Sequence, residues 1–167
     1  MGSEMCIRDR RQAISNLVAM RETEGSNIYG DFIKRADLIA EKLAVIEERS
    51  PQVVEEYQIR LSDRINELLA KHNQVIEPER LLQEVAIFAD RTSITEEIVR
   101  LKSHIKQFKL IIDADQPVGR KLDFLIQEFN REANTIASKA NDYTLAQVVV
   151  EIKAEIEKIR EQIQNIE

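Results

Sequence analysis

The chain has 167 residues and a formal net charge of −6, with 43% hydrophobic, 32% charged and 5% aromatic residues, four Gly and three Pro. This composition favours long helices and excludes a β-sandwich or barrel, and the length predicts one domain. No run of about 18 apolar residues is present, so we expect a cytoplasmic protein without a membrane partner.

The first ten residues, MGSEMCIRDR, do not resemble protein coding sequence. Back-translated from a GTG start codon, they match a transposase adapter used in short-read library preparation. We therefore expect residues 1–10 to be a disordered read-through and residues 11–167 to form a helical domain. The alternative is a genuine disordered N-terminus. Because Cys6 is the only cysteine, residues 11–167 exclude disulfides and thiolate zinc sites.

Apolar residues at helical spacing predict an all-α protein, an elongated bundle of about six helices with heptad-patterned antiparallel packing. The first helix is expected over residues 12–48 and the second over residues 51–71. Ser50 and Pro51 favour a break between them, because Ser is a good N-cap and Pro fits the first helical position. Pro78 begins a third helix.

The fourth predicted helix begins with a capping box, in which Ser93 is followed three residues later by Glu96. Glu97, Arg100 and His104 continue from Ser93 along one edge of its apolar stripe. A carboxylate and an imidazole two turns apart on one helix face can ligate or support a metal ion. The alternative is a boundary histidine bonded to a neighbouring helix, beside a Glu97–Arg100 ion pair that stabilises little.

The helix expected over residues 119–139 has one apolar face, with a strip of short polar side chains beside it. The strip holds Asp123, Gln127, Asn130 and Asn134. Because Asn and Gln amides are mediocre helix formers, their number indicates a hydrogen-bonding role. The apolar face comprises Leu122, Leu125, Ile126, Phe129, Ala133, Ile136, Ala137 and Ala140.

A pair of carboxylates lies on the same predicted helix. Glu128 and Glu132 are four residues apart, so their side chains lie one turn apart on the same side and repel each other unless a cation lies between them. A divalent metal ion with oxygen ligands satisfies both carboxylates. The alternative is an ion pair with Arg131 or with a lysine from another helix.

Basic residues precede and begin this helix. Residues 100–121 contain six Lys and Arg against two Asp, a local excess that favours phosphate binding or forms a solvated helix face. Arg120 and Lys121 stand at the helix start, where backbone N–H groups also favour a phosphate.

The last predicted helix follows Asn141 and Asp142 and has the most regular apolar stripe. Ile at both core positions of a heptad favours assemblies larger than a dimer. The partner of the stripe is another helix of this chain or a neighbouring subunit. The stripe comprises Leu145, Val149, Ile152, Ile156, Ile159, Ile163 and Ile166.

Four segments resemble the YicC/YloC family of bacterial proteins: RETEG (21–25), ADRTSITEEIVRLKSH (89–104), GRKLDFLIQEFNREANTIASK (119–139) and REQIQNIE (160–167). The resemblance runs from about Leu17 to Glu167 and corresponds to the C-terminal half of a family member. It implies a metal-dependent endoribonuclease that acts on RNA and assembles into a homo-oligomer, such as a hexamer. It also implies an N-terminal domain that precedes this chain.

Helical geometry then assigns residues to the roles that the resemblance implies. We expect a divalent cation, Mn²⁺ or Mg²⁺, to activate water for hydrolysis of single-stranded RNA. The runner-up is a non-catalytic helical oligomerisation or RNA-binding module, whose amide-rich face docks a partner helix. In the endoribonuclease, the expected metal ligands are Glu97, His104, Glu128 and Glu132; the expected catalytic residues are Glu97, His104 and Glu128; and the expected phosphate contacts are Arg100, Arg120, Lys121 and Arg131.

One position departs from the family pattern. Ser93 stands where the family usually has Asp. If that Asp is a metal ligand in relatives, this chain lacks it.

Overall fold

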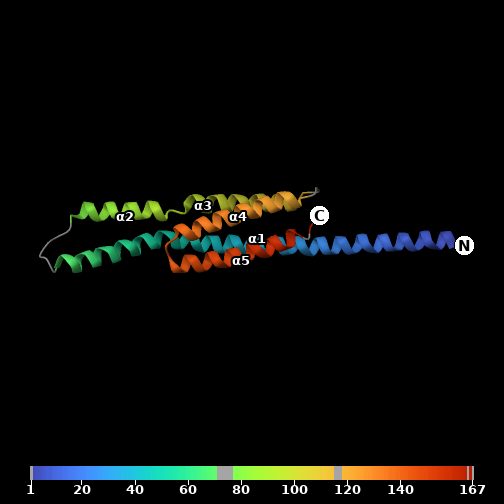
Figure 1. The fold of residues 1–167 in the computed structure, drawn as a ribbon, viewed down its shortest axis with the longest axis horizontal. Helices are drawn as coiled ribbons and strands as arrows, with labels where there is room; N and C mark the ends of the chain where they lie inside the picture. The colour runs from blue at the N-terminus through green and yellow to red at the C-terminus, as the bar shows by residue number, and fades with distance from the viewer. Residues whose placement is uncertain (1, 71–76, 115–117, 165, 167) are drawn as a thin grey trace.

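The computed structural model describes every residue except 1, 71–76, 115–117, 165 and 167. The described residues form α1 (Gly2–Ala70), α2 (Pro78–Thr92), α3 (Thr95–Ile112), α4 (Gly119–Lys139) and α5 (Tyr143–Ile163), and they include no strand. Figure 1 shows α1 running along the whole length of an elongated molecule, with the other helices beside part of it. The all-α prediction is confirmed, but the prediction of six helices was wrong, because the described part of the chain has five.

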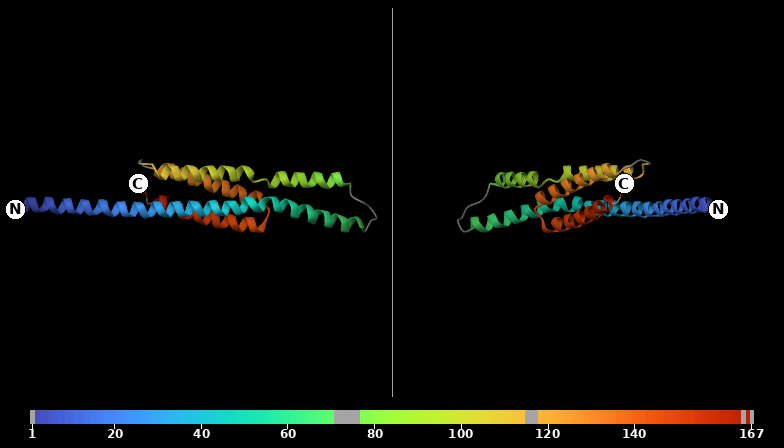
Figure 2. Two further views of the ribbon diagram at one scale, coloured as in Figure 1. Left: turned by 180° about the vertical axis from the view of Figure 1, so that it is seen from behind. Right: turned by 45° about the vertical axis from the view of Figure 1, so that its right-hand side comes forward.

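The predicted break at Ser50 and Pro51 is absent, and α1 continues through both residues. Pro51 has no N–H to donate, so the carbonyl four residues earlier loses its helical hydrogen bond. Packing and side-chain bonds keep the helix continuous: Val53 is 4% exposed, and Arg49 donates to both carboxylate oxygens of Glu56 one turn beyond the proline, at 2.5 and 2.9 Å. Figure 2 shows that the green end of α1 runs in a different direction from its blue end.

One core joins the middle of α1 to α3, α4 and α5. Figure 1 and the interhelical contacts place α5 against α1 and α4, and α3 against α4 and α1. The α5 stripe therefore finds its partner within the chain; each buried Ile contributes about 1.5–3 kcal/mol. The core includes Phe32, Ile39, Leu43 and Ile46 of α1; Ile98, Leu101, Ile105 and Phe108 of α3; Leu122, Ile126, Phe129 and Ile136 of α4; and Leu145, Val149, Ile152, Ile156, Ile159 and Ile163 of α5.

Two local predictions for helix surfaces and starts were wrong. Ala137 is exposed, because the buried face of α4 is narrower than its apolar stripe. The capping box at Ser93 does not form: α3 begins at Thr95 after Ile94, without a side-chain cap. Burial of Ile94, which is 1% exposed, sets this helix start instead. By contrast, Asp142 caps α5 and accepts a hydrogen bond from the backbone N–H of Leu145 at 2.9 Å.

The two ends of α1 extend beyond the shared core. Residues 7–27 are exposed throughout, and at the other end α2 packs on α1 with the rings of Tyr57 and Phe88 stacked 3.7 Å apart. The assignment of residues 1–10 to a read-through stays a prediction; α1 begins at Gly2. Within the described residues, no helix combines the length and the apolar character that crossing a bilayer requires.

Candidate metal centre

Three predicted metal ligands meet where α3 packs on α4. His104 of α3 and Glu128 and Glu132 of α4 each place one potential ligand atom within 4.8 Å of the other two. The Glu128 side chain is 23% exposed and that of Glu132 is 4% exposed, so the cluster is open to solvent on one side only. Two carboxylates and an imidazole thus lie together. Among the described residues, each carboxylate has one arginine within 4 Å, Arg131 for Glu128 and Arg100 for Glu132.

The donor atoms of this cluster fit a divalent metal ion. Two ligands that each lie about 2.1 Å from one ion are at most about 4.2 Å apart, so closure of the cluster requires small side-chain rotations. His104 Nδ1 is buried and has no hydrogen-bond partner in the described part of the chain, a loss that costs about 1–3 kcal/mol. The ring stacks on Phe129 with centroids 6.5 Å apart. An imidazole combined with carboxylates suits Mn²⁺ better than Mg²⁺, which prefers oxygen ligands.

Glu97, the fourth predicted ligand, lies outside this cluster. It is seven residues before His104 on the same helix, which places it about 10 Å away along the axis, too far to share one ion. Its carboxylate instead accepts a hydrogen bond from Lys139 Nζ at 2.7 Å. Burial raises the pKa of the Glu97 carboxyl, but the hydrogen bond and positive charge of Lys139 outweigh burial and bring the pKa below its usual value.

Two of the predicted phosphate contacts flank the cluster. Arg100 Nη1 lies 3.9 Å from a Glu132 oxygen, and Arg131 Nη1 lies 3.6 Å from a Glu128 oxygen. Both side chains are largely exposed, at 47% and 68%, and Arg100 is also bonded to Glu96. Each guanidinium group therefore lies beside a different carboxylate of the cluster, where it can reach an anion that approaches from solvent.

The other two predicted phosphate contacts lie farther away. Arg120 and Lys121 are exposed in the first turn of α4, about 10–12 Å along the helix axis from Glu128. The structure therefore separates these two residues from the cluster, although Glu128 and Glu132 lie on the same helix.

A second polar surface lies on a neighbouring face of α4, where α4 packs on α5. It is a groove of about 810 Å³, and it contains the amide strip that the sequence indicated. The sequence did not predict the contribution of α5, because the register of two helices cannot be read from either one. The groove is lined by Asp123, Ile126, Gln127, Asn130, Arg131, Asn134 and Thr135 of α4 and by Arg160 and Gln164 at the end of α5.

Comparison with known proteins places these features in a family. Residues 46–167 match the family model described as Endoribonuclease YicC-like, C-terminal. The chain belongs to the YicC-like family. It is 54% identical over 155 residues to a probable endoribonuclease YicC from Clostridioides difficile (strain 630), and 38% identical over 154 residues to one from Haemophilus influenzae. These matches cover 93% and 92% of this chain but 53% and 52% of the relatives, so the chain spans about half their length.

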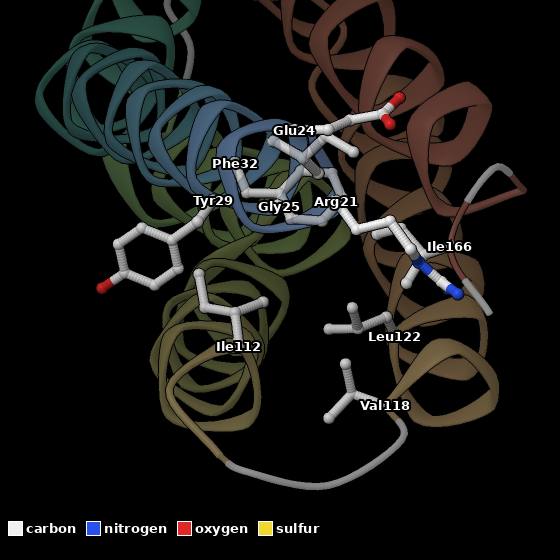
Figure 3. Close-up of a pocket in the computed structure, with 10 residues that line it drawn as sticks. Arg21, Glu24, Gly25, Tyr29, Phe32, Ile112, Val118, Leu122 and Ile166 are labelled. Carbon is white, nitrogen blue, oxygen red and sulfur yellow. The ribbon is translucent and has the colours of Figure 1, made fainter. Parts of the chain in front are cut away.

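The matched YicC-like region contains the whole cluster and the groove, whereas another pocket lies partly outside it. That pocket, of about 260 Å³, is at the end of the bundle, where Arg21, Glu24 and Tyr29 surround a floor that includes Leu122 and Ile166. Figure 3 shows the Arg21 side chain reaching towards Ile166 and Leu122. Leu122, which lines the pocket, lies about 9 Å along α4 from Glu128, and the floor of the pocket is mainly apolar. The pocket is therefore separate from the candidate metal centre.

Proposed function

We propose that this protein is the C-terminal part of a metal-dependent endoribonuclease, which hydrolyses single-stranded RNA at the cluster of His104, Glu128 and Glu132. One observation carries the proposal: the three donor atoms lie within 4.8 Å of one another and include a buried histidine whose Nδ1 has no hydrogen-bond partner among the described residues. The reaction class is drawn from the relatives, which are named as probable endoribonucleases and are about twice as long as this chain.

In this proposal, His104, Glu128 and Glu132 would hold the ion. A bound divalent ion would polarise the phosphate and lower the pKa of a water molecule. Glu132, at 4% exposed, acts as the fixed ligand, whereas Glu128, at 23%, faces solvent and can accept the proton of the attacking water on a carboxylate oxygen. Glu97 is left out of the proposed ligand set because it is paired with Lys139.

The arginines that flank the cluster bind the scissile phosphate in this proposal. A guanidinium group presents donors in a planar fork that matches two phosphate oxygens. Arg100 and Arg131 each lie within 4 Å of a cluster carboxylate, so a phosphate held by both would be next to the ion. Both guanidinium groups are exposed, and at 3.6–3.9 Å from the carboxylates they can turn towards a phosphate that approaches from solvent.

The proposal includes a homo-oligomer, a cytoplasmic location and a divalent cation, Mn²⁺ or Mg²⁺. The non-catalytic module remains the second candidate function, because the amide-rich face of α4 is exposed and offers a surface for binding without chemistry.

The test compares this chain and the full-length Clostridioides difficile relative on labelled single-stranded RNA, with Mn²⁺ or with EDTA. We expect internal cleavage with Mn²⁺ and none with EDTA. Glu132→Gln should slow cleavage at least about 100-fold, because even loss of a residue that only supports a metal ligand costs 10–100-fold. The matched control is Glu79→Gln, which changes an exposed glutamate of α2 away from the cluster and the groove. Cleavage that persists in EDTA contradicts metal dependence. RNA binding without cleavage by either protein favours the non-catalytic module.

A further inference from the structure

We infer that the groove between α4 and α5 binds single-stranded RNA and contacts its bases, and that the strand crosses α4 at Arg131 to reach the cluster. We call this surface the amide groove and define it by Gln127, Asn130, Arg131, Asn134, Arg160 and Gln164. The inference rests on the proposed function, since it names how the same site receives its substrate. It concerns a different surface, however, and is tested separately.

The side chains of the amide groove have the chemistry that base edges require. Each carboxamide carries both a donor and an acceptor, and the unstacked bases of a single strand expose both kinds of group. Gln127 donates to Asp123 at 3.0 Å, whereas the Asn130 and Asn134 amides form no hydrogen bond within the described part of the chain. Asn lowers helix stability relative to Lys or Glu, so solubility alone does not explain two unbonded Asn on this face.

Charge makes the amide groove a place for phosphates. Arg131 on α4 and Arg160 on α5 face one aspartate, Asp123, in a chain whose net charge is −6. Arg160 is 48% exposed and forms an ion pair with Glu157 at 3.5 Å, a type of exposed pair that stabilises little. Each of the two helices thus presents an exposed guanidinium group to the groove, which favours a polyanion over a basic partner.

The amide groove is joined to the candidate metal centre through one residue. Arg131 lines the groove, and its Nη1 lies 3.6 Å from Glu128 of the cluster. Gln127 and Glu128 are consecutive on α4 and are therefore about 100° apart around the helix, so the groove and the cluster occupy neighbouring faces of the same helix. A strand that fills the groove can cross α4 at Arg131 and place its next phosphate between Arg131 and Arg100 of α3.

The experiment measures RNA binding where cleavage cannot occur. Fluorescence anisotropy of labelled single-stranded RNA is recorded with the 167-residue chain in EDTA, for the wild type and for the double variant Asn130→Ala/Asn134→Ala. Two lost hydrogen bonds should weaken binding roughly tenfold. The control is Gln107→Ala, which removes an exposed amide of α3 outside the groove and should change the affinity less than about twofold.

A second probe separates base contacts from charge. An abasic oligonucleotide of the same length keeps the phosphates but has no bases, so it should bind the wild type and the double variant equally. The double variant should bind Mn²⁺ as the wild type does and should unfold at the same or a higher temperature, because Ala is a better helix former than Asn. Because RNA affinity is measured without metal, failure of the cleavage proposal leaves this result standing, and the reverse also holds.

Three outcomes overturn the inference. The first is wild-type affinity for RNA in the double variant, and the second is no RNA binding by the wild type in EDTA. The third is a double variant that no longer self-associates in sedimentation but binds RNA as the wild type does, which would make the amide groove a surface for a partner helix.

Discussion

The buried carboxylate of Glu97 accepts a hydrogen bond of 2.7 Å from Lys139 Nζ, and this bond ties the first turn of α3 to the last turn of α4. The Glu97 side chain is 5% exposed and that of Lys139 is 38% exposed. A carboxylate in this position needs its countercharge, because water cannot replace it fully. Lys139 therefore stabilises the bundle at the end where Glu97 lies and removes Glu97 from the candidate ligand set.

Replacement of Lys139 should show this dependence. Lys139→Ala leaves the Glu97 carboxylate buried without its ammonium partner, and we expect a loss of about 1–3 kcal/mol in the free energy of unfolding. Urea denaturation followed by circular dichroism measures it. Lys153→Ala, at an exposed position of α5, is the control and should change stability by less than about 0.5 kcal/mol. Equal stability of the two variants would contradict the assigned role.

Stability should fall in acid because of three carboxylates. Burial raises the pKa of Glu97, but the hydrogen bond from Lys139 brings it below its usual value of 4.5. Burial also raises the pKa of Asp142, and the hydrogen bond from Arg49 brings it below 3.8. The hydrogen bond from Lys158 lowers the pKa of Glu155, and burial opposes this shift only in part. A carboxyl whose pKa is lower in the folded state contributes stability above its unfolded pKa and loses it as pH falls through the folded value.

The melting temperature should therefore be nearly constant above about pH 5 and fall steeply below about pH 4. Thermal unfolding between pH 2 and pH 7 checks this expectation. Asp142→Asn should flatten the acid limb, because this variant removes one of the titrating groups. An acid limb of unchanged steepness in Asp142→Asn would exclude Asp142 from the effect.

Metal binding should stabilise the fold only when the cluster is intact. A ligand that binds only the folded state at 100 times its Kd adds about 2.7 kcal/mol, which scanning calorimetry detects as a higher Tm. We expect Mn²⁺ to raise the Tm of the wild type but not that of Glu132→Gln or His104→Ala. Without metal, Glu132→Gln should be as stable as the wild type or more so, because it removes repulsion with Glu128. An equal Mn²⁺ shift in all three proteins would place the metal elsewhere.

The four predicted phosphate contacts should separate into two classes. Arg100 and Arg131 lie beside the cluster, whereas Arg120 and Lys121 lie at the start of α4. In the full-length relative, the equivalents of Arg100→Ala and Arg131→Ala should lower kcat/KM about tenfold or more, the effect of one lost bond to a charged group. Changes at the other two positions should have smaller effects that disappear at high salt. Equal losses at all four positions would contradict the geometry.

Periodicity predicted the cores of α3, α4 and α5 because each buried stripe is a property of one helix. Glu128 and Glu132 were correctly placed together for the same reason, since a spacing of four residues fixes their relation. Glu97 was predicted to join His104 in the cluster but lies outside it, because two turns of the same helix separate the two residues by about 10 Å. Arg160 and Gln164 required the register of α5 against α4, which no single helix encodes. Pro51 failed as a helix start because tertiary packing outweighed its local preference.

The Arg49 guanidinium donates to Asp142 at 3.0 Å as well as to Glu56. Asp142 also caps α5, so one side chain connects the helical turns on either side of Pro51 to the residue at which α5 starts. A helix interior interrupted by a proline and the N-terminus of another helix are thereby joined, and neither can open without loss of a charge partner for the other. Although 93 residues separate Arg49 from Asp142 in sequence, we expect the two segments to unfold together.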